Sequence, residues 1–311
     1  MLRVKPGEGN NLMRKYVIPN MRLGATSFLL HETYVPAVRF AAERCDDVAL
    51  LLVEPGERNE YLATPGEIAE IGRIIAGESA TLHVHLPTDA DFDTWQGARS
   101  MIGKIRRVAE LTGPLDPHSF VLHVDFPSLH GTGGEPSAEQ QEWTAEALRE
   151  IAACLPAPER LAVENLETYA PSFWDRWLAG TPYSRCLDVG HIWKDGGDPA
   201  PVLAAWLPRV RVIHLHGLEP RGSEADAAKP QGQQKAPEKL AERNLSRLFG
   251  PRPRDHKSLR LMPPEFVDDV MHPLWKTGFS GVLNLEVFSV EDFTASHAVL
   301  MHSWERYAAS F

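Results

Sequence analysis

Eight short apolar runs recur along the 311-residue chain, and each is followed by a segment whose apolar residues have helical spacing. The runs predict strands at residues 22–30, 48–54, 80–87, 120–125, 160–167, 184–191, 210–217 and 281–288. The segments between them predict helices at residues 35–45, 64–76, 94–112, 137–154, 171–179, 199–206, 264–277 and 290–309. Short apolar strands alternating with helices are typical of a parallel sheet with crossover connections. Eight such units predict an α/β fold closed into a (β/α)8 barrel, the TIM barrel.

The main alternative fold is an open, doubly wound sheet. Sheets of that kind that bind dinucleotides carry a GxGxxG turn after their first strand, and no such turn follows residues 22–30. The length is compatible with the barrel, because α/β barrels commonly run to about 250 residues as one domain. We therefore expect a single barrel domain at residues 21–311, preceded by an N-terminal extension at residues 1–20.

An insertion separates the last two predicted strands, which start about 71 residues apart. Residues 219–253 are rich in Gln, Lys, Pro, Gly and Ala and have no large apolar residue before Leu240. Such a segment cannot bury enough apolar surface to fold alone, so we expect a mobile loop. Either a solvated surface excursion or a lid over a substrate site fits this composition.

The charge balance argues against nucleic acid as a partner. The chain has 32 Lys and Arg against 42 Asp and Glu, a formal net charge of −10, and its only dense basic cluster is at residues 252–260. Phosphate binding depends on many Lys and Arg contacts, so duplex DNA or RNA is a poor match. A small-molecule substrate is the better expectation, and the sequence leaves the oligomeric state open.

The sequence also indicates a cytoplasmic protein without a membrane anchor. No window of about 18 apolar residues is present, and the first 20 residues lack the apolar core of a secretory signal. The three cysteines, Cys45, Cys154 and Cys186, form no CxxC pair. We therefore expect a reducing compartment and no thiolate metal site.

Ionisable side chains fall at the carboxyl ends of six consecutive predicted strands, where a (β/α)8 barrel builds its reaction site. Side chains alternate faces along a strand, so two residues separated by one position both point into the barrel. Several carboxylates and imidazoles converging in a low-dielectric interior require a countercharge, which a divalent cation supplies. The residues concerned are His83, His85, His123, Glu164, Asp188, His191, His214, His216 and Glu286, with His256 returning from the loop after the seventh strand.

A single histidine at a strand end is more often a hydrogen-bonded structural residue than a metal ligand. Here, however, seven of the 13 histidines belong to the set, which is hard to explain by independent packing. The strongest single element is Asp188-x-x-His191, because one turn after a strand can direct both side chains towards one ion. Imidazole with carboxylate suits Zn²⁺, Fe²⁺ or Mn²⁺. This many ligands fits two or three ions better than one.

In this order the residues resemble the xylose isomerase-like TIM barrels, over about residues 22–290. The resemblance is closer to the branch containing AP endonucleases of the endonuclease IV type, whose site holds three metals. It implies that Glu164, Asp188, His214 and Glu286 match the core shared with sugar isomerases and epimerases. It also implies that His85, His123, His191 and His256 match the extra ligands of the phosphodiesterase branch. One departure is Arg254, which stands where the nuclease pattern has Asp, so the role of the neighbouring Asp255 is left open.

Within that superfamily the phrases LGATSF, VHLPTD, CLDVGH, VIHLHG, RDHKSL and LEVFS most resemble the cobamide-remodelling phosphodiesterases, the CbiR family. The resemblance implies a metal-dependent phosphoric diester hydrolase. Its substrate would be a cobamide, a small corrinoid cleaved at the phosphoester of its nucleotide loop to give a cobinamide-type product.

Roles for individual residues follow from that resemblance and from the chemistry of phosphodiester hydrolysis. Glu164 would bridge two ions, Glu164 or Glu286 would accept a proton, and His256 would complete the metal shell. Lys257 and Arg254 would hold phosphate oxygens, although a solvated basic loop explains them as well. Trp193 would pack on the planar substrate, although packing at the barrel rim is the simpler explanation.

Other functions remain open. A sugar isomerase or epimerase would need only the core of Glu164, Asp188, His214 and Glu286, and the three further imidazoles of His85, His123 and His256 count against it. An AP endonuclease would use the whole metal set, but the net charge counts against DNA. A metal-storing or ligand-sensing barrel would bind metal tightly without turnover.

Overall fold

The computed structural model describes residues 15–52, 62–221, 245–249 and 253–310. Eight parallel strands close into a barrel in the order β1-β10-β7-β6-β5-β4-β3-β2. The prediction of a single (β/α)8 barrel is confirmed. The strands are β1 (Arg22–Thr26), β2 (Asp47–Leu51), β3 (Thr81–His85), β4 (Phe120–His123), β5 (Leu161–Glu164), β6 (Ser184–Asp188), β7 (Val210–Leu215) and β10 (Val282–Leu285).

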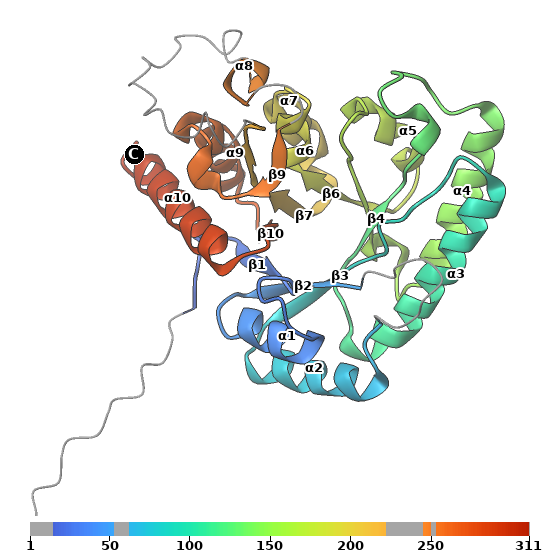
Figure 1. Cartoon of the computed structure of the whole chain (residues 1–311), viewed down its shortest axis with the longest axis horizontal. Helices are drawn as coiled ribbons and strands as arrows, with labels where there is room; N and C mark the ends of the chain where they lie inside the picture. The colour runs from blue at the N-terminus through green and yellow to red at the C-terminus, as the bar shows by residue number, and fades with distance from the viewer. Residues whose placement is uncertain (1–14, 53–61, 222–244, 250–252, 311) are drawn as a thin grey trace, which may run out of the picture.

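Helices surround the strands on the outside of the barrel (Figure 1). The apolar faces of these helices and the outward-pointing strand residues form one continuous core between the two layers. This arrangement buries the stripe of apolar residues that predicted each helix. The helices are α1 (Tyr34–Ala42), α2 (Pro65–Gly77), α3 (Trp95–Thr112), α4 (Ala138–Ala153), α5 (Asp175–Leu178), α6 (Val189–Lys194), α7 (Pro199–Trp206), α8 (Leu245–Phe249), α9 (Pro264–Thr277) and α10 (Val290–Ala308).

Local capping signals fix several helix starts. At α2 the Thr64 side chain accepts from the backbone of Glu67, and the Glu67 carboxylate accepts from the Thr64 backbone. Ser137 and Gln140 form the same reciprocal capping box at α4. Each box satisfies backbone N–H groups that a helix start leaves without partners, so these helices begin where the sequence places Ser or Thr three residues before Glu or Gln.

The sixth strand is shorter than predicted. It ends at Asp188, and α6 begins at the next residue, so the expected strand at residues 184–191 is wrong over its last three positions. The Asp188 carboxylate caps this helix by accepting from the backbone N–H of His191 at 2.7 Å. The apolar run alone concealed this change of structure.

A second, two-stranded sheet was not predicted. Strand β8 (Gly217–Glu219) pairs antiparallel with β9 (Arg254–Lys257) across the insertion. This pairing returns the chain to the barrel mouth. Most of the insertion, residues 222–244 and 250–252, lies outside the described residues, so the prediction of a mobile loop there is not tested.

Residues 1–14 of the predicted N-terminal extension also lie outside the described residues. The part that follows contacts the barrel. Ile18 is buried and bridges to Met21, and the Trp275 indole donates to the Pro19 carbonyl at 3.1 Å. Among the residues that the structure describes, no helix is long and apolar enough to cross a membrane.

An apolar layer inside the barrel supports the mouth. It consists of Val121, Ala162, Cys186, Val212 and Val282, all fully buried. On four neighbouring strands the residue two positions further along also points inward and is His or an acid, because strand side chains alternate. These residues are His123, Glu164, Asp188 and His214, so the ionisable side chains stand directly above an apolar floor.

Candidate metal centre and active site

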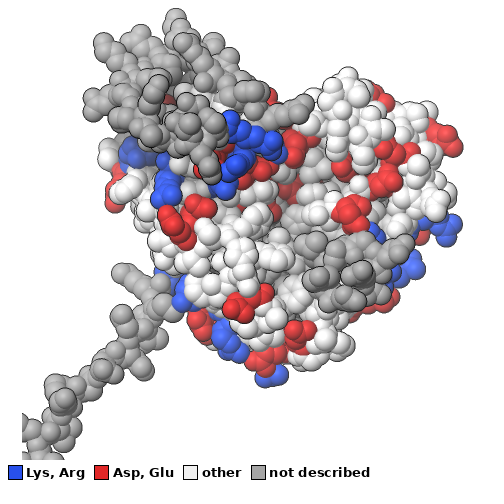
Figure 2. Space-filling view, viewed as in Figure 1, with Lys and Arg blue, Asp and Glu red and all other residues white. Residues whose placement is uncertain are grey.

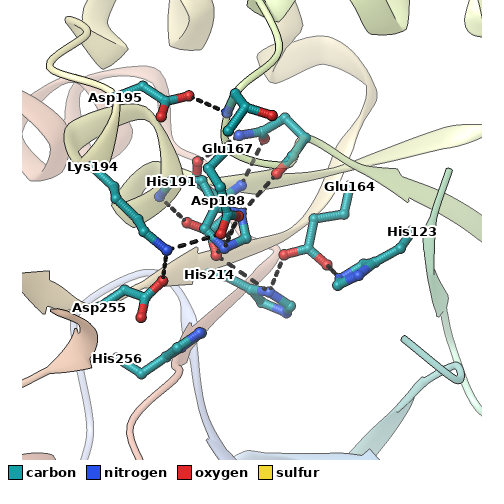
Figure 3. Close-up of polar contacts among 12 residues, drawn as sticks. His123, Glu164, Glu167, Asp188, His191, Lys194, Asp195, His214, Asp255 and His256 are labelled. Atoms are coloured by element: carbon teal, nitrogen blue, oxygen red, sulfur yellow. Dashed lines mark hydrogen bonds and ion pairs between the residues drawn. The ribbon is translucent and has the colours of Figure 1, made fainter. Parts of the chain in front are cut away.

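Glu164 lies at the centre of the barrel mouth. Its Oε1 atom is 2.9 Å from His214 Nδ1, and its Oε2 atom is 3.0 Å from His123 Nε2. Figure 3 shows the Glu164 carboxylate between these two imidazoles. Glu164, the last residue of β5, therefore contacts one imidazole from β4 and one from β7.

Two further carboxylates approach the same nitrogen atom of His214. Its Nδ1 atom lies 3.2 Å from Glu286 Oε2 and 3.9 Å from Asp188 Oδ2. Glu164, Asp188 and Glu286 are each at most 4% exposed, and Asp188 Oδ2 has no hydrogen-bond partner among the described residues. Three buried acids around one imidazole leave excess negative charge. The four side chains are thus a fitting donor set for a divalent cation.

A second cluster adjoins the first through Glu164. His85 Nε2 lies 3.3 Å from Glu164 Oε2, the same oxygen that His123 contacts. The ligand atoms of His85, His123 and Glu164 are within 4.8 Å of one another, which suits one ion. Because the two oxygens of Glu164 face different imidazoles, this carboxylate is placed to bridge two cations.

A third cluster consists of His191, His216 and His256, whose ligand atoms also lie within 4.8 Å of one another. Asp188 joins it to the first cluster, because Asp188 Oδ1 is 3.4 Å from His216 Nε2. His216 was recognised in the sequence but not assigned as a ligand. It belongs to this group as closely as His191 does.

Two backbone features bring the third cluster together. A Cβ atom at Gly190 would overlap the His216 imidazole, so only glycine allows this approach. His256 has φ of 52°, in the left-handed region that non-glycine residues rarely adopt. In this conformation its N–H donates to His216 Nδ1 at 3.0 Å. The strain is held by the pairing of β8 with β9.

The carboxylates of the barrel mouth are held in their ionised form by the imidazoles around them. Burial alone would raise the pKa of Glu164, but the His214 and His123 imidazoles lower that pKa well below its usual value. Burial would likewise raise the pKa of Glu286, and His214 lowers it well below the usual value. Burial would lower the pKa of His191, but Asp188 and Glu167 raise it to about 9. The ionised carboxylates therefore stabilise positive charge at the barrel mouth, such as that of the protonated His191.

The sequence did not reveal the neighbours of His191. Lys194 Nζ donates to Glu167 at 2.8 Å and also pairs with Asp255, as Figure 3 shows. Glu167 lies 3.3 Å from His191 Nε2. The Asp255 carboxylate, whose role the sequence left open, pairs with Lys194 in this structure.

His83 does not reach the mouth, although it shares a face of β3 with His85. Its Nδ1 atom lies 2.5 Å from Asp47 Oδ1, and His118 Nε2 lies 2.9 Å from the other oxygen of Asp47. Two residues along a strand correspond to about 6.6 Å. His83, which the sequence grouped with the strand-end residues without assigning it as a ligand, therefore lies one layer deeper than His85.

A cavity of about 400 Å³ opens above the carboxylates. The predicted residues that line it are His85, His123, Glu164, His191, His256 and Glu286. Its other walls were not named as site residues in the sequence, because they carry no ionisable strand-end pattern or lie outside it: Phe28, His31, Leu51, Thr88 and Phe288.

The predicted substrate-binding residues lie elsewhere. Trp193 is 1% exposed and packs edge to face on Phe266, so it belongs to the core and does not line the cavity. Arg254 and Lys257 lie 3.6 and 3.7 Å from Glu219 Oε2, outside the cavity lining. In Figure 2 basic side chains gather beside the grey segment at the upper left, and acidic side chains spread over the rest of this face.

No family model and no curated protein sequence matches the chain. Solved structures do match. A D-tagatose 3-epimerase-like protein superimposes with a TM-score of 0.65 and 16% identity, covering 93% of this chain and 99% of that chain. L-ribulose 3-epimerase superimposes with a TM-score of 0.63 and 14% identity, covering 93% of this chain and 96% of that chain. A xylose isomerase domain protein from Planctomyces limnophilus superimposes with a TM-score of 0.59 and 11% identity, covering 92% of this chain and 97% of that chain. The chain therefore shares the (β/α)8 barrel fold of these proteins.

These structural similarities correct one expectation from the sequence. The solved structures reported above are epimerases or isomerase-like proteins, and this contradicts the prediction of a phosphoric diester hydrolase. Nothing in the comparisons supports a cobamide as the substrate. The comparisons show the barrel fold that the resemblance implies, and nothing in them supports its narrower phosphodiesterase branch.

Proposed function

We propose that the chain is a divalent-metal-dependent epimerase or isomerase of a small ketose. The observation that carries this proposal is the convergence of Glu164, Asp188 and Glu286 on His214 beneath an open cavity. Structural similarity to D-tagatose 3-epimerase-like and L-ribulose 3-epimerase proteins supports it. Epimerisation beside a carbonyl needs buried acid-base groups, which this site has, and stabilisation of a developing negative charge, which a bound cation would supply.

Glu164 and Glu286 are the proposed acid-base pair. Both line the cavity, and they come from β5 and from the residue after β10, three places apart in the barrel order. Inverting a carbon next to a carbonyl requires removal of its proton from one face and return of a proton to the other. Two carboxylates reaching the cavity from well-separated strands provide such a pair of proton acceptor and donor.

Glu164, Asp188, His214 and Glu286 would hold the cation. A divalent cation there supplies a Lewis acid that stabilises negative charge on the oxygen atoms of the substrate. Asp188 is fixed for this role by its hydrogen bond to the His191 backbone, which leaves Oδ2 without a protein partner. His214 presents Nδ1 to the carboxylates.

The extra imidazoles extend this proposal to two or three ions. The clusters around His123 and around His216 each group three ligand atoms within 4.8 Å, and neither is needed for the four-residue core. Nitrogen and oxygen donors without thiolates suit Zn²⁺, Mn²⁺ or Fe²⁺. We assign these ions a structural role. One would fix Glu164, which the His123 cluster shares with the core, and another would fix Asp188, which contacts His216 of the third cluster.

The cavity fits a small polyhydroxylated substrate. About 400 Å³ lies within the usual range for small-molecule sites. Phe28 and Phe288 offer aromatic faces for the C–H side of a sugar, and His31 and Thr88 offer polar atoms for its hydroxyl groups.

The test is a panel of ketopentoses and ketohexoses incubated with protein loaded with Mn²⁺, Zn²⁺ or Fe²⁺. Conversion to an epimer or aldose, lost on chelation and restored by metal, is the expected result. A protein that binds metal tightly but converts none of these sugars would support a metal-storing barrel and contradict the proposal. Glu305→Gln, an exposed change on α10, serves as the control variant.

A further inference from the structure

A second cavity lies at the opposite end of the barrel from the metal centre. Its volume is about 690 Å³. Arg22 is the first residue of β1, Arg211 is the second residue of β7, and His118 comes just before β4. All three line the cavity, so it opens at the amino ends of the strands. The catalytic carboxylates stand at the carboxyl ends, and the cavity is therefore separate from the proposed active site.

The charge of this cavity is one-sided. Two arginines and a histidine line it, and none of its lining residues is an acid, although the whole chain has a net charge of −10. Arg22 Nη1 donates to Thr81 Oγ1 at 2.9 Å. Arg211 donates to the His118 carbonyl at 3.2 Å and to Ser184 Oγ at 3.1 Å. Within the described part of the chain, neither guanidinium pairs with a carboxylate.

The nearest buried acid does not neutralise these arginines. Asp47 is fully buried behind the cavity floor. One of its oxygens contacts His83 at 2.5 Å, and the other contacts His118 at 2.9 Å and Thr81 Oγ1 at 2.5 Å. Its hydrogen-bonding capacity is therefore met by imidazoles and a hydroxyl. The direct polar partners of Arg22 and Arg211 are neutral, and Asp47 reaches Arg22 only through the Thr81 hydroxyl.

The remaining walls of the cavity are largely apolar. Leu207, Pro208, Val210 and Phe279 are among its lining residues. A volume of about 690 Å³ again falls within the small-molecule range. Guanidinium groups bind phosphate and carboxylate through paired N–H donors, and a desolvating wall strengthens such bonds.

We propose that this cavity binds a small organic anion, with its phosphate or carboxylate on Arg22 and Arg211 and its apolar part against Leu207 and Phe279. The ligand sits at the amino ends of the strands, makes no contact with the metal-binding residues, and is distinct from the ketose substrate. His118 lines the cavity, but its ring nitrogens contact Asp47 and Ser119, so the two arginines are the proposed anion donors.

The experiment titrates phenyl phosphate, phenylacetate, inorganic phosphate and neutral phenol into the full-length protein, with and without EDTA. Phenyl phosphate or the phenylacetate carboxylate should bind more tightly than inorganic phosphate, phenol should not bind, and EDTA should not change the affinities. The stronger of the two aryl anions identifies the preferred head group. If EDTA abolishes binding, the anion sits at the metal centre and the proposal fails.

Variants locate the site. Arg22→Gln and Arg211→Gln should each weaken binding of the aryl anion by at least about tenfold, the value of one charge-assisted contact. Arg211→Lys keeps the charge but loses the paired donors, so it should give an intermediate loss in a protein that folds normally. Arg99→Gln, on α3 and outside the cavity lining, should bind as the unchanged protein does. Equal losses for Arg99→Gln and the cavity variants, or no binding of either aryl anion at millimolar concentration, would overturn the proposal.

Discussion

Glu164 Oε1 lies 2.9 Å from His214 Nδ1, and the other oxygen of the same carboxylate faces the imidazoles of His85 and His123. One side chain therefore belongs to two of the three ligand clusters. Because the Glu164 carboxylate is buried, water does not compete for its contacts with these imidazoles. The proposed chemistry depends on this residue more than on any other.

Glu164→Gln should remove metal from both clusters that share the residue. The amide keeps the size of the side chain but removes its negative charge and one acceptor oxygen. Bound metal should fall by at least one ion per chain, and epimerase activity should fall by about 100-fold or more, as expected for loss of a positioned acid-base group. Elemental analysis and sugar conversion measure the two effects. Retention of full metal content with unchanged activity would contradict the shared role of Glu164.

The variant His123→Ala tests whether activity needs the additional ligands or only the four-residue core. His123 belongs to the cluster with His85 and Glu164, but not to the four-residue core. The variant should lose one ion and keep epimerase activity within about tenfold, because Glu164 stays hydrogen-bonded to His214. Activity that falls as far as in Glu164→Gln would show that the second ion takes part in the reaction.

Gly190→Ala should disrupt the third cluster without removing any ligand. An added Cβ atom would overlap the His216 imidazole, so this ring must move away from His191 and His256. We expect loss of one ion and lower thermal stability. The matched control is Gly77→Ala at the end of α2, where an added Cβ has nothing within 4 Å. The control should be neutral or slightly stabilising. Identical metal content in both variants would exclude an ion at this cluster.

Metal binding at the third cluster should release protons. Asp188 and Glu167 raise the pKa of His191 to about 9 against the opposing effect of burial, so the metal-free protein carries this proton at pH 7. A bound cation displaces it, because a ligand imidazole must be neutral. Affinity should therefore increase as the pH rises towards about 9. Proton release on adding Zn²⁺ to metal-free protein at pH 7.5 measures this, and its absence in Gly190→Ala is the expected control result.

The ion pair between Asp268 on α9 and Arg306 on α10 should make the free energy of unfolding depend on pH. Arg306 donates to both Asp268 oxygens, at 2.7 and 2.6 Å, and Ser303 donates as well. Burial would raise the pKa of Asp268, but these donors lower it below its usual value. The pair therefore stabilises the fold above about pH 4, the unfolded value, and this contribution disappears as the pH falls through the lower folded value.

A double-mutant cycle with Asp268→Asn and Arg306→Gln tests that pair. The coupling free energy at pH 7 should be about 1 kcal/mol, since the arginine is partly exposed and solvent screens the pair. It should decline once the pH falls below about 4. Coupling that is absent at pH 7 in denaturant unfolding would contradict the predicted stabilisation.

The repeated pattern of the sequence was sufficient to predict the barrel. The observed bounds of α7 and α9 match the predicted ranges, because Pro near each start and the apolar spacing mark them. The end of β6 could not be predicted in this way. Asp188 is both the last strand residue and a helix cap, and an apolar run gives no sign of that change.

The candidate site was predicted less completely than the fold. Alternation along a strand shows which residues face inward but not how deep they lie, so His83 and His85 looked equivalent. Trp193 follows a strand end in the sequence, but the turn into α6 sends it to the core against Phe266. The approach of His256 to His216 depends on pairing between β8 and β9 across the insertion, a long-range contact without a local signal.

Hydrogen exchange at the substrate carbon tests the central claim most directly. Metal-loaded protein is incubated with ketoses in heavy water, and deuterium at the carbon beside the carbonyl is measured by NMR or mass spectrometry. The account predicts incorporation together with epimer formation, both abolished in Glu164→Gln and unchanged in Glu305→Gln. Folded, metal-saturated protein that incorporates no deuterium into any ketose of the panel would contradict it.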